Sequence, residues 1–279
     1  MRSKQAPGNH GRRGLDSLGY IEREGSLGLV QEAFHPVVSA SRERLAQAFA
    51  HDLHSAYLYG SVPRGTARPG VSDLDLLLAL HHPPTEAARA LAREVGDGLD
   101  ADYAVIDGVS VLVHGKAELL SEAERYDTGW FLACLCTALL GPDLAEHLPR
   151  YRPDERLARE SNGDLPLLLP RWRAQVAAAS GPAERRSLSR LFARKLVRSA
   201  FTLVMPRWGG WTSDLTRSTE IFADFYPHEP ARVAELRRAA AVARNPSPDP
   251  AVLTEFTEDL GPWLAAEYTA VLGGRAPRP

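Results

Sequence analysis

Apolar residues change their spacing along the chain, and these changes divide it into segments of different secondary structure. From Leu27 to about Ala50 they recur at helical spacing, which predicts a first amphipathic helix. Short apolar runs then predict strands, with a helix over 85–96 among them. The predicted strands cover 55–59, 73–80, 102–106 and 110–113. This alternation indicates an α/β module.

Beyond about residue 116 the pattern is helical throughout, with Pro and Gly at the breaks. The N-terminal residues show no periodicity, which is typical of a mobile tail. We therefore expect a tail over 1–25, an α/β domain over 26–116 and an all-helical domain over 117–279. The predicted helices cover 122–140, 154–160, 164–179, 183–204, 217–225, 229–243 and 249–272.

Composition narrows the class of protein. The 279 residues are 44% hydrophobic and 24% charged, which is enough apolar material for a sizeable core. The longest apolar run, Trp130 to Leu140, is too short to cross a bilayer, and it contains the two cysteines, Cys134 and Cys136. A membrane span, a disulfide framework and a zinc site are excluded on these grounds. With no secretory signal, we expect a cytoplasmic protein.

Two aspartates stand one residue apart at the start of the strand predicted over 73–80. Because side chains alternate along a strand, Asp73 and Asp75 point to the same side. Leu74 and Leu76 point into the core. Two carboxylates this close repel each other unless a cation lies between them. Mg²⁺ suits the pair, because it prefers oxygen ligands and keeps positions for water and substrate phosphates.

The loop before this strand has the features of a phosphate site. Gly60 and Ser61 directly follow the strand predicted over 55–59, and a glycine lets backbone N–H groups approach a phosphate. If a helix starts at Ser61, its free N–H groups and the hydroxyl add an anion site. Arg64 and Arg68 can donate charge-assisted hydrogen bonds to phosphate oxygens. Loop and carboxylate pair together describe a site for a triphosphate and its metal.

The combined pattern resembles the signature of nucleotidyltransferases of the DNA polymerase β superfamily, and within it the minimal and aminoglycoside-adenylylating branch. It consists of Gly60-Ser61, Arg64-Gly65 and Ser72-Asp73-Leu74-Asp75-Leu76. The resemblance implies a small mixed sheet flanked by helices, ATP as donor with two Mg²⁺ ions, and transfer of a nucleotidyl group. It implies nucleotide binding by Gly60, Ser61, Arg64 and Ser72, and metal binding and catalysis by Asp73 and Asp75.

The same resemblance implies a third carboxylate on a neighbouring strand, close to the pair. Asp102, at the head of the strand predicted over 102–106, is the first candidate and Asp100 the second, whereas Asp107 fits a turn. Asp102 would bind metal and accept the proton of the attacking hydroxyl, a contribution of about 10²- to 10⁴-fold. A two-metal clamp would stabilise the attacking and leaving oxygens.

An arginine row marks the helix predicted over 183–204. Arg186, Arg190, Arg194 and Arg198 recur at steps of four, beside an apolar face that includes Leu191. At about 100° per residue the row drifts toward that face, so Arg198 is expected nearest the core boundary. The resemblance implies that the helical domain supplies cations to the triphosphate, and Arg198 and Arg217 match. The alternative is a solvated basic face.

The acceptor is the least constrained part of the hypothesis. We expect a small hydroxylated molecule, with an aminoglycoside-type antibiotic as first candidate. Residues 171–210 carry nine cations and one acid, which disfavours polycations such as streptomycin or spectinomycin. A net charge of -2 and only a short basic stripe also argue against a nucleic-acid partner. Possible pocket residues are Glu160, Asp164, Asp214, Glu220, Trp172, Trp208 and Trp211.

Two other functions fit the same signature. One is a minimal nucleotidyltransferase that modifies a protein or tRNA, as in toxin and antitoxin systems. The other is a degenerate member that binds nucleotide without catalysis. Degenerate members usually lose a metal carboxylate, and both Asp73 and Asp75 are present, so catalysis is favoured.

Overall fold

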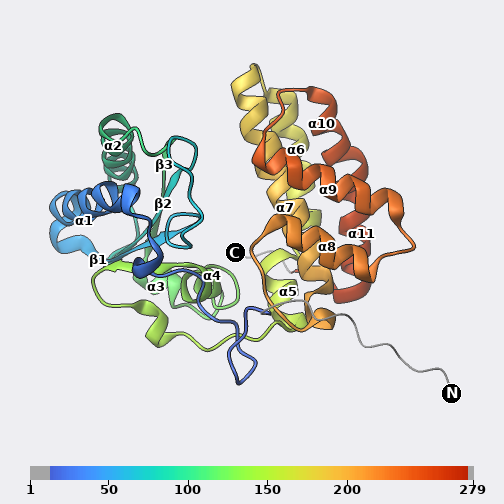
Figure 1. Ribbon diagram of the computed structural model, residues 1–279, viewed down its shortest axis with the longest axis horizontal. Coiled ribbons are helices and arrows are strands. Elements are labelled where there is room, and N and C mark those ends of the chain that lie inside the picture. Colours follow the sequence, from blue (N-terminus) through green and yellow to red (C-terminus); the bar gives the residue numbers. More distant parts are fainter. Residues whose placement is uncertain (1–12, 276–279) are drawn as a thin grey trace. The chain divides into compact units, whose positions relative to one another are not determined.

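The computed structural model describes residues 13–275 (Figure 1). Contacts divide the described chain into two units. One covers residues 22–151 and contains the sheet. The other covers residues 13–21 and 152–275 and is helical. The architecture predicted from the sequence, an α/β unit followed by a helical one, is confirmed.

Four strands form one mixed sheet in the order β3-β2-β1-β4. β2 pairs with β1 antiparallel and with β3 parallel, and β4 pairs with β1 antiparallel. Three of these four strands, β1, β2 and β3, were predicted, but β4 was not, since its residues were assigned to a helix over 122–140. The apolar run there splits into a short helix and a strand, a choice that periodicity alone cannot make. The strands are β1 (Leu53–Tyr59), β2 (Leu74–Leu80), β3 (Val109–Gly115) and β4 (Thr137–Leu140).

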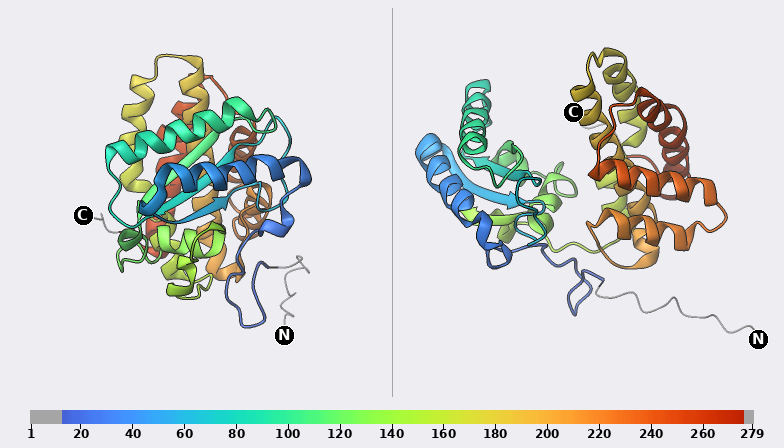
Figure 2. Two further views of the ribbon diagram at one scale, coloured as in Figure 1. Left: turned by 90° about the vertical axis from the view of Figure 1, so that its left-hand side faces the viewer. Right: turned by 45° about the horizontal axis from the view of Figure 1, so that its top comes forward.

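Helices cover both faces of the sheet. In the left view of Figure 2, α1 (His35–Phe49) and α2 (Glu86–Asp102) lie in front of the strands. Leu74, Leu76 and Leu78 of β2 are fully buried in the core that these two helices share with the sheet. On the other face, alternate residues of β1 and β2 pack against α3 (Lys116–Leu119) and α4 (Thr128–Leu135). The two faces of β2 therefore have different neighbours.

One predicted strand is wrong. Residues 102–106 do not form a strand, because α2 runs on to Asp102 and is followed by turns that lead to β3. The helix passes through Gly96, where an added Cβ would already touch Val109 and Val111 at 3.5 Å. The helix thus lies close to β3 at Gly96, and its packing there outweighs the low helix propensity of glycine.

The second unit is built around one long helix, α7 (Pro182–Trp208). It packs against all the other α-helices of its unit. Those are α5 (Glu155–Asn162), α6 (Leu165–Ala178), α8 (Leu215–Phe225), α9 (Pro230–Arg244), α10 (Pro250–Glu255) and α11 (Gly261–Leu272), with a π-helical turn Phe256–Leu260 between the last two. The predicted helices of this half are confirmed to within a few residues.

The N-terminal segment is bound along the part that the structure describes. Residues 1–12 of the predicted tail lie outside the described residues. The backbone N–H of Trp211 donates to the carbonyl of Arg13 at 2.8 Å, and Leu15 bridges to Ile21. From Glu22 onward the segment packs on the sheet unit, through two 3₁₀ turns, Leu27–Leu29 and Glu32–Phe34. Further 3₁₀ turns cover Ala50–Asp52 and Leu144–His147.

The two cysteines are buried and unoxidised. Burial raises the pKa of the Cys134 thiol to about 12 and holds that of Cys136 well above its usual range. Over the described residues, no helix is both long and apolar enough to cross a membrane.

Candidate functional site

The carboxylate pair stands where β2 begins. Asp75 is the second residue of β2 and Asp73 directly precedes the strand. Asp75 alternates with Leu74 and Leu76, which are fully buried under α1 and α2. Side-chain alternation therefore directs Asp73 and Asp75 to the face of α3 and α4. Both aspartates are half-buried.

Gly60 makes room for one of these carboxylates. It follows β1 with φ +81°, a backbone region that favours glycine. A Cβ at this position would lie 2.2 Å from Oδ2 of Asp75, which is inside van der Waals contact. Tyr59 and Asp75 are register partners, so the glycine passes directly beside the carboxylate. Both the backbone and the space thus require glycine here.

Tyr59 and Ser110 flank the pair, and sequence reasoning missed both. Ser110 is the register partner of Asp75 on β3. Burial raises the pKa of Tyr59, and the charges of Asp75 and Asp73 raise it further, while a hydrogen bond with Ser110 opposes them. Tyr59 is therefore protonated at neutral pH and can donate a hydrogen bond at the strand edge. Tyr59 directly precedes Gly60 of the motif, which was a usable signal, whereas nothing in the local sequence marks Ser110.

The loop between β1 and β2 is a series of turns. Residues 61–65 form hydrogen-bonded turns and no helix, so the helix considered at Ser61 is absent. The N–H of Thr66 donates to the carbonyl of Ser61 at 3.0 Å. The N–H of Arg68 donates to Oγ of Ser72 at 2.9 Å. Ser72 thus closes the loop immediately before the carboxylate pair.

Arg64 lies in this loop and has an acidic neighbour. Its Nη1 is 3.4 Å from Oε2 of Glu24, and both side chains are partly buried. Arg68 is exposed. The loop thus contains one arginine held by a carboxylate and one that reaches solvent.

The structure does not bring Asp102 to the pair. Asp102 is the last residue of α2, and α2 covers the opposite face of the sheet from the one that Asp73 and Asp75 face. Its Oδ2 is 2.6 Å from Nη2 of Arg44. Oδ1 of Asp100 accepts the N–H of Gly108 at 2.7 Å. Among residues 13–275, no three acidic, His or Cys side chains gather into a group that could hold a metal.

Arg198 lies differently from its predicted place. We expected it nearest the core boundary, yet it is exposed, whereas Arg190 and Arg194 are half-buried. Leu191, assigned to the apolar face, is 53% exposed. The prediction fails because α7 is the central helix of its unit and has no single apolar face. All residues over 196–205 are buried except Arg198, so an exposed cation interrupts a buried stretch.

Arg217 belongs to the first turn of α8. Its N–H donates to Oδ1 of Asp214, the N-cap, at 2.8 Å, and its Nη1 is 3.2 Å from Oε2 of Glu220. Two acids considered for the acceptor pocket, Asp214 and Glu220, are thus engaged by this arginine.

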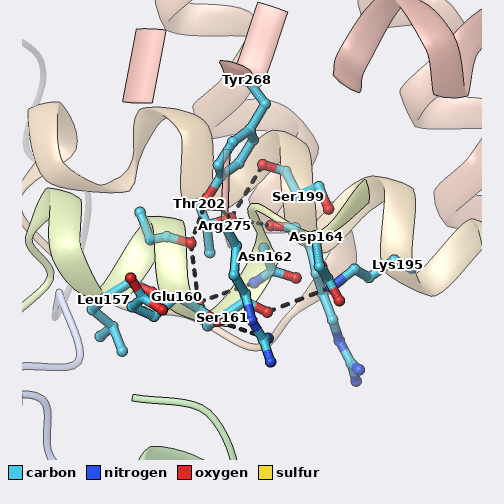
Figure 3. Close-up of polar contacts among 12 residues, drawn as sticks. Leu157, Glu160, Ser161, Asn162, Asp164, Lys195, Ser199, Thr202, Tyr268 and Arg275 are labelled. Carbon is cyan, nitrogen blue, oxygen red and sulfur yellow. Dashed lines mark hydrogen bonds and ion pairs between the residues drawn. The ribbon is translucent and has the colours of Figure 1, made fainter. Parts of the chain in front are cut away.

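The other candidate acids of the helical unit join a polar cluster between α5, α7 and α11 (Figure 3). Lys195 points at Asp164, with Nζ 2.5 Å from Oδ1, and reaches the carbonyl of Ser161 at 3.4 Å. The hydroxyls of Thr202 and Tyr268 lie 3.2 Å apart in the same cluster. It therefore stabilises the bundle from within.

The three tryptophans considered for a pocket wall are buried. Trp172 stacks on Phe192 at a centroid distance of 4.2 Å. Trp208 and Trp211 meet Phe201 edge-on. Their exposed fractions are 4%, 7% and 7%, which fits core residues.

Comparisons with known proteins agree with the fold. Residues 39–124 match the family model described as a nucleotidyltransferase domain. Among solved structures, the chain is similar to a spectinomycin adenyltransferase, AAD(9) from Enterococcus faecialis, determined with ATP and spectinomycin. The TM-score is 0.52 and the identity 13%, over 84% of this chain and 99% of that one. The likeness at this identity concerns the fold. No curated protein matches the chain.

Proposed function

We propose that this chain, whose residues 39–124 form a nucleotidyltransferase domain of the DNA polymerase β-like kind, is an enzyme. It transfers an adenylyl group from ATP to a hydroxyl of a small molecule. One observation carries this proposal. The half-buried residues Asp73 and Asp75 stand where β2 begins, and Gly60 leaves room for the carboxylate of the second.

The donor set of this pair fits a divalent cation. Mg²⁺ is usually held by one or two carboxylates, with water and substrate phosphates in its other positions. We assign this task to Asp73 and Asp75. A bound cation would neutralise phosphate charge and stabilise the oxygens of the displacement. A second ion, and Asp102 as third ligand and general base, stay predictions from the sequence.

The reaction is an in-line displacement. The acceptor oxygen forms a bond to the α-phosphorus of ATP, the bond to the bridging oxygen breaks, and pyrophosphate leaves with the electron pair. The acceptor hydroxyl gives up its proton to a carboxylate. In the proposal, Gly60 and Ser61 bind phosphate through backbone N–H groups, and Arg64 donates to phosphate oxygens. Ser72 keeps the loop closed beside the carboxylates.

Two cations of the helical unit, Arg198 and Arg217, stay predictions from the sequence as nucleotide contacts. Arg198 is the exposed residue in an otherwise buried stretch of α7. Arg217 is the second proposed contact, and its ion pair with Glu220 should reduce its contribution to nucleotide affinity.

Donor and acceptor are supported to different degrees. ATP is favoured because the similar adenyltransferase was determined with ATP. For the acceptor, residues 171–210 are strongly basic, which favours a neutral or anionic hydroxylated molecule over a polycation. An aminoglycoside-type antibiotic is the first candidate to test, because the same adenyltransferase was determined with spectinomycin.

The test combines binding and turnover. The protein is incubated with labelled ATP, Mg²⁺ and a panel of hydroxylated antibiotics of positive, zero and negative charge, and pyrophosphate release and product mass are followed. Asp73→Asn and Asp75→Asn should each reduce transfer by about 10²- to 10³-fold, because each removes part of a cation site worth several kcal/mol.

A matched control shows whether the loss of a negative charge away from the site affects transfer. Asp97→Asn removes an exposed carboxylate from α2 and should leave transfer unchanged. Far-ultraviolet circular dichroism checks that each variant is folded. Unchanged calorimetric affinity for Mg-ATP in Asp73→Asn and Asp75→Asn would contradict the proposed site.

A further inference from the structure

The N-terminal segment 23–31, here called the strap, runs along the loop that contains Arg64. The N–H of Ser26 donates to the carbonyl of Pro63 at 2.9 Å, and Nε2 of Gln31 donates to the carbonyl of Gly65 at 3.0 Å. A Cβ on Gly65 would lie 2.7 Å from the carbonyl oxygen of Leu29. The strap therefore fixes the loop from outside.

The strap itself is anchored at its start. Nη1 and Nη2 of Arg23 bind the two carboxylate oxygens of Asp143 at 2.5 and 3.1 Å, and Nε donates to the carbonyl of Ala133 at 3.0 Å. Burial works to raise the pKa of Asp143, but the hydrogen bonds and charge of Arg23 hold it below its usual range. The N–H of Glu24 donates to the carbonyl of Cys134 at 2.7 Å. Glu24 is thus on a fixed piece of backbone.

Glu24 uses this position to reach Arg64. The carboxylate is 21% exposed and the guanidinium 33%, so the pair is partly shielded from water. A guanidinium presents five N–H donors in one plane. A carboxylate on one nitrogen can therefore fix its orientation while another edge serves a second anion.

We propose that Glu24 is a positioning residue for nucleotide binding, which holds the Arg64 guanidinium toward the phosphates from a backbone fixed by the strap. The inference rests on the proposed function, in which Arg64 contacts the triphosphate. Ordering the guanidinium before binding reduces the conformational entropy lost when the phosphate arrives.

The contact between Glu24 and Arg64 is longer than the other ion pair that involves the strap. Nη1 of Arg64 is 3.4 Å from Oε2 of Glu24, whereas Arg23 binds both carboxylate oxygens of Asp143 at 2.5 and 3.1 Å. Charge-assisted N–H···O bonds are usually about 2.7–2.9 Å long, so the contact of Glu24 is the weaker of the two. Whether Glu24 orients Arg64 or competes with phosphate is decided by the sign of the change in affinity when its charge is removed.

The experiment is calorimetric titration of the full chain with Mg-ATP. Glu24→Gln should weaken binding by about two- to fivefold, the range for a partly exposed ion pair. Glu22→Gln is the matched control, since it removes the same charge from an exposed position two residues earlier and should change nothing. Arg64→Gln should weaken binding by about tenfold or more, because a charged hydrogen bond is lost.

The double variant distinguishes positioning from a structural role. If Glu24 acts through Arg64, adding Glu24→Gln to Arg64→Gln has no further effect on affinity. Glu24→Asp, which keeps the charge but withdraws it by one methylene, should lose part of the affinity. Equal melting temperatures for all variants show that folding is intact.

The outcomes separate the two proposals. Wild-type protein that binds no Mg-nucleotide, with GTP, CTP and UTP included, overturns the proposed function and this inference together. If Arg64→Gln weakens binding but Glu24→Gln behaves like Glu22→Gln, the positioning role alone is overturned. Tighter binding in Glu24→Gln also overturns it, since Glu24 would then compete with phosphate.

Discussion

Two pairs of aspartates in the sheet unit have the same spacing and opposite arrangements. Asp73 and Asp75 stand at the start of a strand, where a spacing of two places side chains on one side. Asp100 and Asp102 end a helix, where the same spacing turns them by about 200°, twice the helical angle. Alternation directs the first pair to one side, whereas the second pair binds two separate partners, Gly108 and Arg44.

The comparison shows that secondary structure decides whether two residues at this spacing point to the same side. If a strand had started at Asp102, as predicted, Asp100 and Asp102 would have pointed to one side like the first pair. Instead α2 continues to Asp102, so the second pair lies in the helix layer on the other face of the sheet. A shared facing is therefore expected of the first pair alone.

The largest expected effect is at the glycine beside the first pair. Gly60→Ala strains a backbone with φ +81° and places a Cβ within 2.2 Å of Oδ2 of Asp75. We expect the free energy of unfolding to fall by about 1–3 kcal/mol. Mg-ATP affinity should fall by more than about tenfold, because the carboxylate must move. Chemical denaturation and calorimetry measure the two effects.

Gly108→Ala is the matched variant for the second pair. Gly108 has φ +102°, and nothing lies within 4 Å of an added Cβ. It should therefore show backbone strain of about 1–2 kcal/mol without a comparable loss of affinity. Equal affinity losses in the two variants would mean that strain alone, and no displaced carboxylate, explains the effect of Gly60→Ala.

A smaller effect is expected at the first member of the helical pair. Asp100→Ala removes the acceptor of the Gly108 N–H, and the carbonyl of Gly108 in turn accepts the N–H of Leu74 at 3.0 Å. We expect a loss of stability of about 1 kcal/mol, visible in urea denaturation. A large loss of turnover in a variant that is still folded would identify Asp100 as a functional carboxylate. That result would contradict the contrast drawn here between the two pairs.

The smallest effect is expected at Asp102. The ion pair with Arg44 is 34% and 57% exposed, so Asp102→Asn should cost about 0.2–0.5 kcal/mol. Turnover should stay within about twofold of the wild type, since α2 keeps this carboxylate away from the first pair. Retained ATP binding with lost turnover is what the role predicted from the sequence requires, and that result would reverse our assignment.

Much of the fold could be predicted because its signals are local. The helices of the second unit each carry their own period, and some have a capping side chain, such as Asp154 and Asp214. β1 and β2 are short apolar runs next to glycine or aspartate. β4 could not be predicted, because Thr137–Leu140 becomes a strand only through pairing with β1.

The residues of the site also divide into those that the sequence could predict and those that it could not. Gly60, Asp73 and Asp75 carry a contiguous motif that is visible in the sequence. Glu24 is forty positions from Arg64, and Ser110 meets Asp75 only through the parallel pairing of β2 and β3. The exposure of Arg198 depends on six surrounding helices. Such relations arise from tertiary packing and have no counterpart in local spacing.

The buried cysteines have a practical consequence for the chemistry of the chain. The thiolate is the form of cysteine that peroxides and alkylating agents attack, and a pKa of about 12 leaves very little of it at Cys134. Cys136 is shielded still more completely. The folded protein should therefore resist oxidation and alkylation at both cysteines, so it can be handled without a reducing agent to protect them.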